Sequence, residues 1–119
     1  MADRTFSGAV KDALGGIVQS LRNERNLQTQ VALGAIAIAV AAVLHFRPIQ
    51  WAVLALAIGV VLGAELTNTA LEHLVDLVQP EQHELARAVK HAAAAAVLVA
   101  ALAALAAGVW LYGSAFYGW

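Results

Sequence analysis

Four polar side chains interrupt a long apolar stretch in the middle of the chain. They are Glu65, Asn68, Glu72 and Asp76, and a run rich in Ala, Val, Leu and Ile precedes them. At about 100° of rotation per residue, all four fall on one narrow side of a helix. Carboxylate and amide oxygens, without sulfur or a paired histidine motif, are ligands that suit Mg²⁺. The spacing therefore predicts one wall of a site that binds a metal ion together with phosphate oxygens and water.

The composition predicts that this helix lies in a membrane. The chain of 119 residues is 61% hydrophobic and 13% charged, whereas soluble domains are about 45–50% apolar and about 25% charged. Three apolar segments, at about 27–46, 49–78 and 92–112, approach the roughly 20 residues that a helix needs to cross a hydrocarbon core. We expect an all-α membrane protein, with a single domain over residues 1–119.

The residues before the first span predict a further helix at about 5–25. Apolar side chains recur there at spacings of three and four, with polar residues such as Lys11 and Asp12 between them. Such an amphipathic helix is suited to lying on a membrane surface, although a short helix packed on the bundle would show the same pattern. In either arrangement Glu24 lies where the chain turns into the membrane.

The acidic residues at membrane depth need a physical reason. If the second span enters the membrane near Ile49, Glu65 lies roughly 24 Å along its axis, inside the edge of a core about 30 Å thick. A charge at such depth costs on the order of 2.5–3.5 kcal/mol on insertion scales, and neighbouring carboxylates repel unless a cation or a shared proton intervenes. Binding of a cation explains the row; a structural polar seam between helices is the alternative.

The distribution of Lys and Arg predicts the orientation. Arg47 alone lies between the first and second spans, whereas six basic residues precede the first span or follow the second: Arg4, Lys11, Arg22, Arg25, Arg87 and Lys90. Basic residues accumulate on the cytoplasmic side of membrane proteins. The N-terminus is therefore expected in the cytoplasm and the C-terminus outside. The net charge of −1 gives no sign of a nucleic-acid partner, and without cysteine there is no disulfide or thiol nucleophile.

The order of these polar residues resembles a known family. An E-x-x-N-x-x-x-E-x-x-x-D pattern runs from Glu65 to Asp76, and His83-Glu84-Leu-Ala, Lys90 and a small-residue run at 92–96 follow it. This arrangement is similar to that of the small prokaryotic integral-membrane lipid kinases, bacterial diacylglycerol kinase and undecaprenol kinase. The resemblance covers nearly the whole chain in order and spacing.

Two further positions refine the resemblance. Glu24-Arg25-Asn26, just before the first span, resembles the undecaprenol kinase branch more than the diacylglycerol kinase branch. His91 departs from the family pattern, which has Asp directly after the lysine. A carboxylate, which accepts hydrogen bonds, is replaced there by an imidazole.

The resemblance implies a homotrimer in the bacterial plasma membrane, with active sites between subunits. Such an enzyme transfers the γ-phosphoryl group of MgATP to the hydroxyl of a membrane lipid. The implied acceptor is undecaprenol, with diacylglycerol as the alternative. A non-catalytic or degenerate three-span membrane subunit is the alternative of another class.

The resemblance also implies roles for individual residues. Glu65 resembles the general base, and Glu24 and Glu72 resemble the Mg²⁺ ligands. The remaining positions resemble contacts that orient the site or bind the nucleotide: Asn68, Asp76, Lys90 and, in its altered form, His91.

Overall fold

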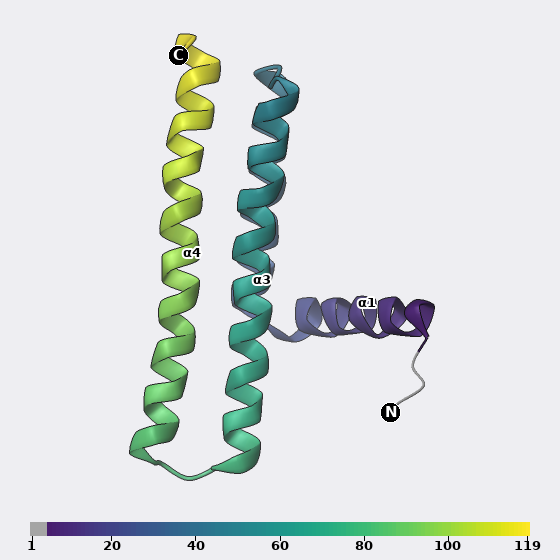
Figure 1. The fold of residues 1–119 in the computed structure, drawn as a ribbon, viewed down its shortest axis with the longest axis vertical. Coiled ribbons are helices and arrows are strands. Elements are labelled where there is room, and N and C mark those ends of the chain that lie inside the picture. The colour runs from purple at the N-terminus through teal and green to yellow at the C-terminus, as the bar shows by residue number, and fades with distance from the viewer. Residues whose placement is uncertain (1–4) are drawn as a thin grey trace.

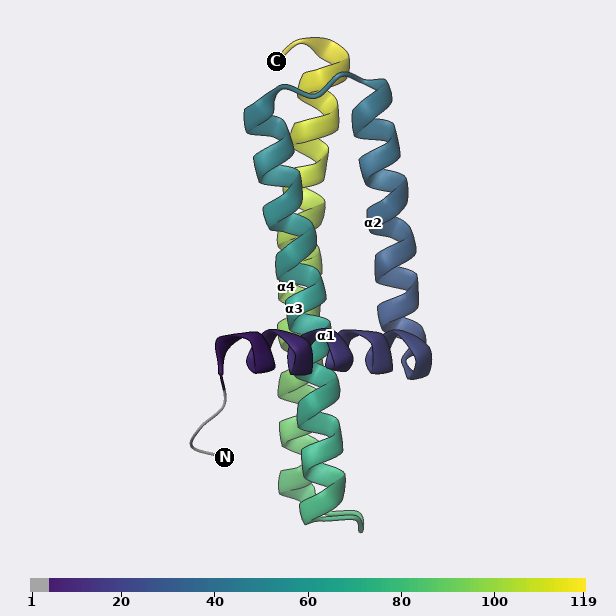
Figure 2. The same ribbon diagram turned by 90° about the vertical axis from the view of Figure 1, so that its right-hand side faces the viewer.

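The protein folds into four α-helices, as a computed structural model that describes residues 5–119 shows. They are α1 (Phe6–Asn23), α2 (Arg25–Val43), α3 (Pro48–Val78) and α4 (Glu84–Tyr117). The helices α2, α3 and α4 run side by side, and α1 crosses them nearly at a right angle (Figures 1 and 2). All three of the long helices are long and apolar enough to cross a membrane. The expected all-α architecture with three spans is confirmed.

The turn from α1 into α2 takes a single residue. Glu24 has an extended backbone, with φ −112° and ψ 111°. The side chain of Gln28 closes the junction, since its Nε2 donates to the carbonyl oxygen of Leu21 at 2.8 Å. Among the described residues of α1 no side chain is buried, and Phe6 and Leu14 are exposed. The placement of α1 on a membrane surface stays a prediction.

The turn between α2 and α3 is short, as its sequence requires. His45 takes the left-handed conformation, with φ 55°, and α3 begins at Pro48, where a missing N–H costs nothing. Gln50 Oε1 accepts a hydrogen bond from the Arg47 N–H at 2.7 Å and caps the helix. The α2 helix ends at Val43, three residues before the predicted end of the first apolar segment, because this turn uses them.

The packed core lies at one end of the bundle, which we call the turn end because the α2–α3 turn and the C-terminus meet there (Figure 2). Ala41, Phe46, Leu54 and Leu111 form the buried cluster. The ring of Phe46 contacts the ring of Tyr112, with centroids 5.1 Å apart. Beside this cluster, a buried hydrogen bond from Gln50 Nε2 to Ser114 Oγ, at 2.9 Å, also joins α3 to α4.

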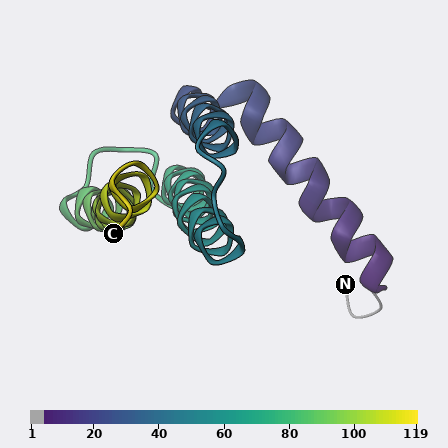
Figure 3. The same ribbon diagram turned by 90° about the horizontal axis from the view of Figure 1, so that it is seen from above.

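At the opposite end, which we call the loop end, α3 and α4 continue past α1 (Figures 1 and 2). The short loop 79–83 joins them there. The α4 helix extends beyond the predicted apolar segment of 92–112 in both directions. Seen from above, α2 and α4 flank α3 from different directions (Figure 3), and α3 packs against both. The acidic residues of α3 thus lie toward the loop end, away from the buried core.

Candidate active site

The acidic row predicted on α3 is present as one polar side of the helix. Asn68 Nδ2 donates to Glu72 Oε1 at 3.5 Å, one turn further along. Asn68 Oδ1 is buried and has no hydrogen-bond partner within residues 5–119. A buried polar atom without a partner is costly unless a ligand satisfies it. This amide oxygen and the Glu72 carboxylate are therefore the acceptor oxygens that a bound ligand or metal ion could contact.

Glu65 is the buried carboxylate of the row. Only 5% of its surface is exposed, and it lies where the apolar part of α3 ends. No Lys or Arg in the described part of the chain forms an ion pair with it. A carboxylate in such a place is expensive to keep, which favours a functional reason for it.

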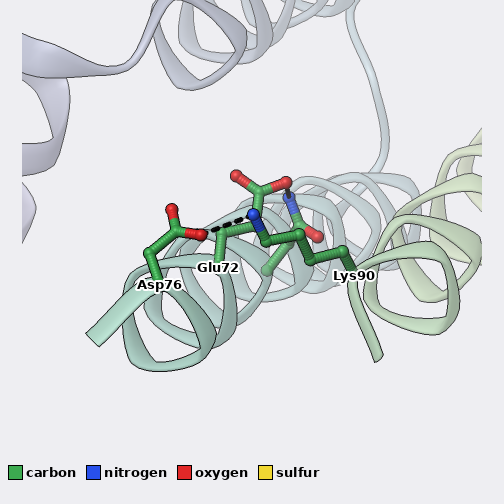
Figure 4. A network of polar contacts seen from close by, with 4 residues as sticks. Glu72, Asp76 and Lys90 are labelled. Atoms are coloured by element: carbon green, nitrogen blue, oxygen red, sulfur yellow. Dashed lines mark hydrogen bonds and ion pairs between the residues drawn. The ribbon is translucent and has the colours of Figure 1, made fainter. Parts of the chain in front are cut away.

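An ion pair joins α4 to the outer part of the row. Lys90 Nζ lies 2.6 Å from Asp76 Oδ1, and the labelled side chains of Glu72, Asp76 and Lys90 approach one another in Figure 4. Both partners are well exposed, so the pair contributes little to stability. Its effect is positional, because it holds an ammonium group beside the carboxylates.

A cavity of about 370 Å³ opens next to this ion pair, under the loop that joins α3 to α4. Lys90, His91 and Asp76 line it, together with Arg87 and the loop. Its volume is in the range of ligand sites, about 300–1,000 Å³. Sequence reasoning had not assigned Arg87 to the site. The available signal was helical spacing, since Arg87 precedes Lys90 by three residues and shares its side of α4.

Glu24 lies apart from this cavity. Its Oε1 is 3.5 Å from His73 Nε2, and both residues line a separate cavity of about 210 Å³ between α1 and α3. His73 precedes Asp76, which lines the larger cavity, by three residues along α3, so the two cavities border neighbouring sides of that helix. Within residues 5–119 no three His, Asp or Glu side chains are grouped to hold a metal ion. That Glu24 and Glu72 share one metal stays a prediction.

The donors at Glu72 nevertheless fit a magnesium ion that arrives with a nucleotide. A carboxylate and a free amide oxygen are hard oxygen ligands. Mg²⁺ commonly uses one or two protein carboxylates and completes its coordination with phosphate oxygens and water. A complete cluster of protein ligands in one chain is therefore unnecessary.

Three membrane-length helices thus carry a buried carboxylate in α3 and, toward one end, further carboxylates and a lysine, a combination that favours a functional site over a purely structural bundle. The model of the prokaryotic diacylglycerol kinase family matches residues 11–112. The chain belongs to this family: it is a lipid kinase and a bacterial membrane protein, as the resemblance predicted.

Two characterised relatives cover most of the chain. It is 37% identical over 97 residues to an undecaprenol kinase of Bacillus subtilis, with 82% of this chain and 79% of the relative aligned. It is 43% identical over 97 residues to a diacylglycerol kinase of Synechocystis sp., with 81% of this chain and 55% of the relative aligned. The two relatives support the lipid kinase class equally and leave the acceptor open.

Proposed function

We propose that the protein transfers the γ-phosphoryl group of MgATP to the hydroxyl of undecaprenol, with diacylglycerol as the alternative acceptor. The observation that carries this proposal is the placement of Glu65. It is buried on the same helix side as Asn68, Glu72 and Asp76, while Lys90 and a cavity lie at the other end of the row. One end of the row can therefore meet a lipid, and the other can meet a water-borne nucleotide.

Glu65 is the general base in this proposal. A base must come within hydrogen-bond reach of the hydroxyl whose proton it removes. Glu65 is the row's innermost carboxylate and lies on α3 between its apolar part and its polar end, where the hydroxyl of a lipid anchored in the hydrocarbon core would lie. Its carboxylate accepts the proton as the lipid oxygen attacks the γ-phosphorus.

The remaining residues bind and orient the nucleotide. Glu72 and Glu24 would hold the magnesium ion, and Asn68 would offer its free amide oxygen beside Glu72. When bound, the metal neutralises charge on the phosphate oxygens, which is the main requirement of phosphoryl transfer. Lys90, held by Asp76, adds a positive charge, and His91 lines the cavity that receives the rest of the nucleotide.

The choice of undecaprenol rests on the segment before the first span. Glu24-Arg25-Asn26 resembles the undecaprenol kinase branch, and the relative from Bacillus subtilis bears that name. The relative from Synechocystis sp. is a diacylglycerol kinase, so diacylglycerol is the second candidate acceptor.

The assembly that we propose is a homotrimer with active sites between subunits, the N-terminus in the cytoplasm and the C-terminus outside. Support for a shared site is that Glu24 joins no cluster of three acidic or histidine groups within the described chain. Gly59 and Gly63 face open space on α3, where another helix could approach closely. The excess of Lys and Arg before α2 and after α3 supports the orientation.

A phosphate-transfer assay tests the proposed function. The protein is placed in nanodiscs that contain either undecaprenol or diacylglycerol and is supplied with MgATP carrying a radioactive γ-phosphate. We expect label in undecaprenol. Label in diacylglycerol alone would show that diacylglycerol is the acceptor, and the protein would still be a lipid kinase. Label in neither lipid would overturn the proposal.

A further inference from the structure

Two basic side chains of α4 line the cavity under the loop 79–83, and they differ in their partners. Lys90 is held by Asp76, with Nζ and Oδ1 2.6 Å apart. Arg87, one turn earlier on α4, lines the same cavity and forms no ion pair within residues 5–119. Arg87 is therefore the basic group of this cavity whose charge no carboxylate of the described chain offsets.

The acidic groups near Arg87 leave it unpaired. Glu81 of the loop also lines the cavity, and Glu84 precedes Arg87 by three residues on α4. Neither carboxylate forms an ion pair with Arg87 in the described part of the chain. One turn further along α4, where a carboxylate could also pair with it, the residue is His91. The guanidinium thus keeps its hydrogen-bond donors for water or for a ligand.

The cavity and its charges suit a ligand that carries several phosphates. Arginine presents its N–H donors in a rigid planar fork that matches two oxygens of a phosphate. The α4 helix begins beside the cavity, so the positive end of its dipole adds to the charge of the two basic residues. Lys90 shares its charge with Asp76, which leaves Arg87 as the stronger phosphate contact of the two.

We infer that Arg87 binds the phosphate chain of the nucleotide by charge-assisted hydrogen bonds. Arg87 lies nearer to the loop than Lys90 does, so its ligands are the phosphates that are not transferred. The inference rests on the part of the proposed function that brings MgATP into this cavity. Arg87 exchanges no proton: it contributes affinity, and its loss raises the KM for MgATP while kcat stays at the parental value.

A graded series of substitutions tests this role. Arg87→Lys keeps the charge and loses the fork, Arg87→Gln removes the charge, and Arg87→Glu reverses it. We expect the KM for MgATP to rise by about tenfold in Arg87→Gln, as the loss of a charged hydrogen bond implies. The rise should be smaller in Arg87→Lys and larger in Arg87→Glu, with kcat parental in all three. The control is Arg47→Gln, which removes an exposed arginine at the turn end and should leave the KM parental.

The dependence of the KM on salt supplies a second readout. Contacts between exposed charges weaken as ionic strength rises. We therefore expect the KM of the parent for MgATP to increase more steeply with the concentration of KCl than the KM of Arg87→Gln. A side chain that only packs against the loop would leave the two slopes equal.

Two results would overturn the inference. One is a parental KM for MgATP in Arg87→Gln. The other is an equal rise of the KM in Arg87→Gln and Arg87→Glu with the parental dependence on salt, because that pattern marks lost packing and not a lost charge.

Binding of MgADP, measured by calorimetry in detergent without lipid, separates this inference from the proposed function. If the parent labels neither lipid but binds MgADP more tightly than Arg87→Gln does, the proposed function fails and the role of Arg87 stands. If the parent labels a lipid and Arg87→Gln has the parental KM, only the role of Arg87 fails. If the parent neither labels a lipid nor binds MgADP, both fail.

Discussion

The turn end and the loop end of the bundle are built differently. At the turn end both polar atoms of the Gln50 amide have partners: its Nε2 donates to Ser114 Oγ at 2.9 Å and its Oε1 accepts from the Arg47 N–H. At the loop end Asn68 leaves a buried oxygen without a partner in the described chain, and Lys90 reaches an exposed carboxylate. One end satisfies its own polar groups, and the other keeps them available.

This difference suggests that the turn end holds the helices together and that the loop end binds ligands. The buried cluster and its aromatic neighbours hold α2, α3 and α4 together at the turn end. Fixing long helices at one end leaves their other ends able to present side chains to ligands or to another subunit. A site that must admit a lipid from the side and a nucleotide from water cannot also be closely packed within one chain. The comparison predicts that substitutions at the loop end change activity and that those at the turn end change stability.

Glu65→Gln should have the largest effect. The amide keeps the shape of the side chain but cannot take the proton of the lipid hydroxyl, and general bases contribute about 10²–10⁴-fold to rates. We expect kcat to fall by at least about a hundredfold, with the KM for MgATP and the Tm close to parental values. Turnover at the parental rate would show that Glu65 is not the base.

Glu72→Gln should have the next largest effect, through the metal. Replacing a charged ligand by a neutral one weakens the binding of Mg²⁺, so the magnesium concentration for half-maximal activity should rise by about tenfold or more. This concentration is measured by titrating the activity with Mg²⁺ at a fixed concentration of ATP. Glu84→Gln, in the exposed first turn of α4, is the matched control and should titrate like the parent.

Lys90→Gln should have a smaller effect, confined to the nucleotide. It removes the ammonium that Asp76 holds at 2.6 Å, and the loss of a charged contact should raise the KM for MgATP by about tenfold. Lys11, the other lysine of the chain, lies on α1, and Lys11→Gln serves as the control with an expected parental KM. An unchanged KM in Lys90→Gln would remove this residue from the site.

Gln50→Met, at the turn end, should have the smallest effect on activity and should instead lower the stability of the protein. It leaves the Arg47 N–H without its acceptor and breaks the bond to Ser114. Unpaired buried groups of this kind cost about 1–3 kcal/mol. We expect a Tm lower by several degrees in detergent, with kcat and both KM values parental at 20 °C. A loss of activity without a lower Tm would contradict the expectation that substitutions at the turn end change stability and not activity.

Much of the fold follows from sequence because its signals are local. Apolar length places three spans, and Pro48 marks the start of α3. Helical periodicity also places Glu65, Asn68 and Glu72 on one side, since that prediction depends only on residues of the same helix.

The contacts between helices could not be predicted in this way. The hydrogen bond between Gln50 and Ser114 joins α3 to α4 across 64 positions of the sequence. Nothing in the local sequence specifies which turn of one helix faces which turn of the next. Arg87 was missed for a related reason, because its place in the site depends on how the loop 79–83 folds beside α4.

The acidic side of α3 is proposed to bind the metal ion of the nucleotide. Electron–nuclear double resonance, with Mn²⁺ in place of Mg²⁺, can detect this binding. The protein is labelled with carboxyl-¹³C glutamate and given Mn²⁺ and ATP. We predict a ¹³C hyperfine coupling to the metal that loses intensity in Glu72→Gln and is unchanged in Glu84→Gln. A coupling that keeps its full intensity in Glu72→Gln, or no coupling in the parent, would contradict the account.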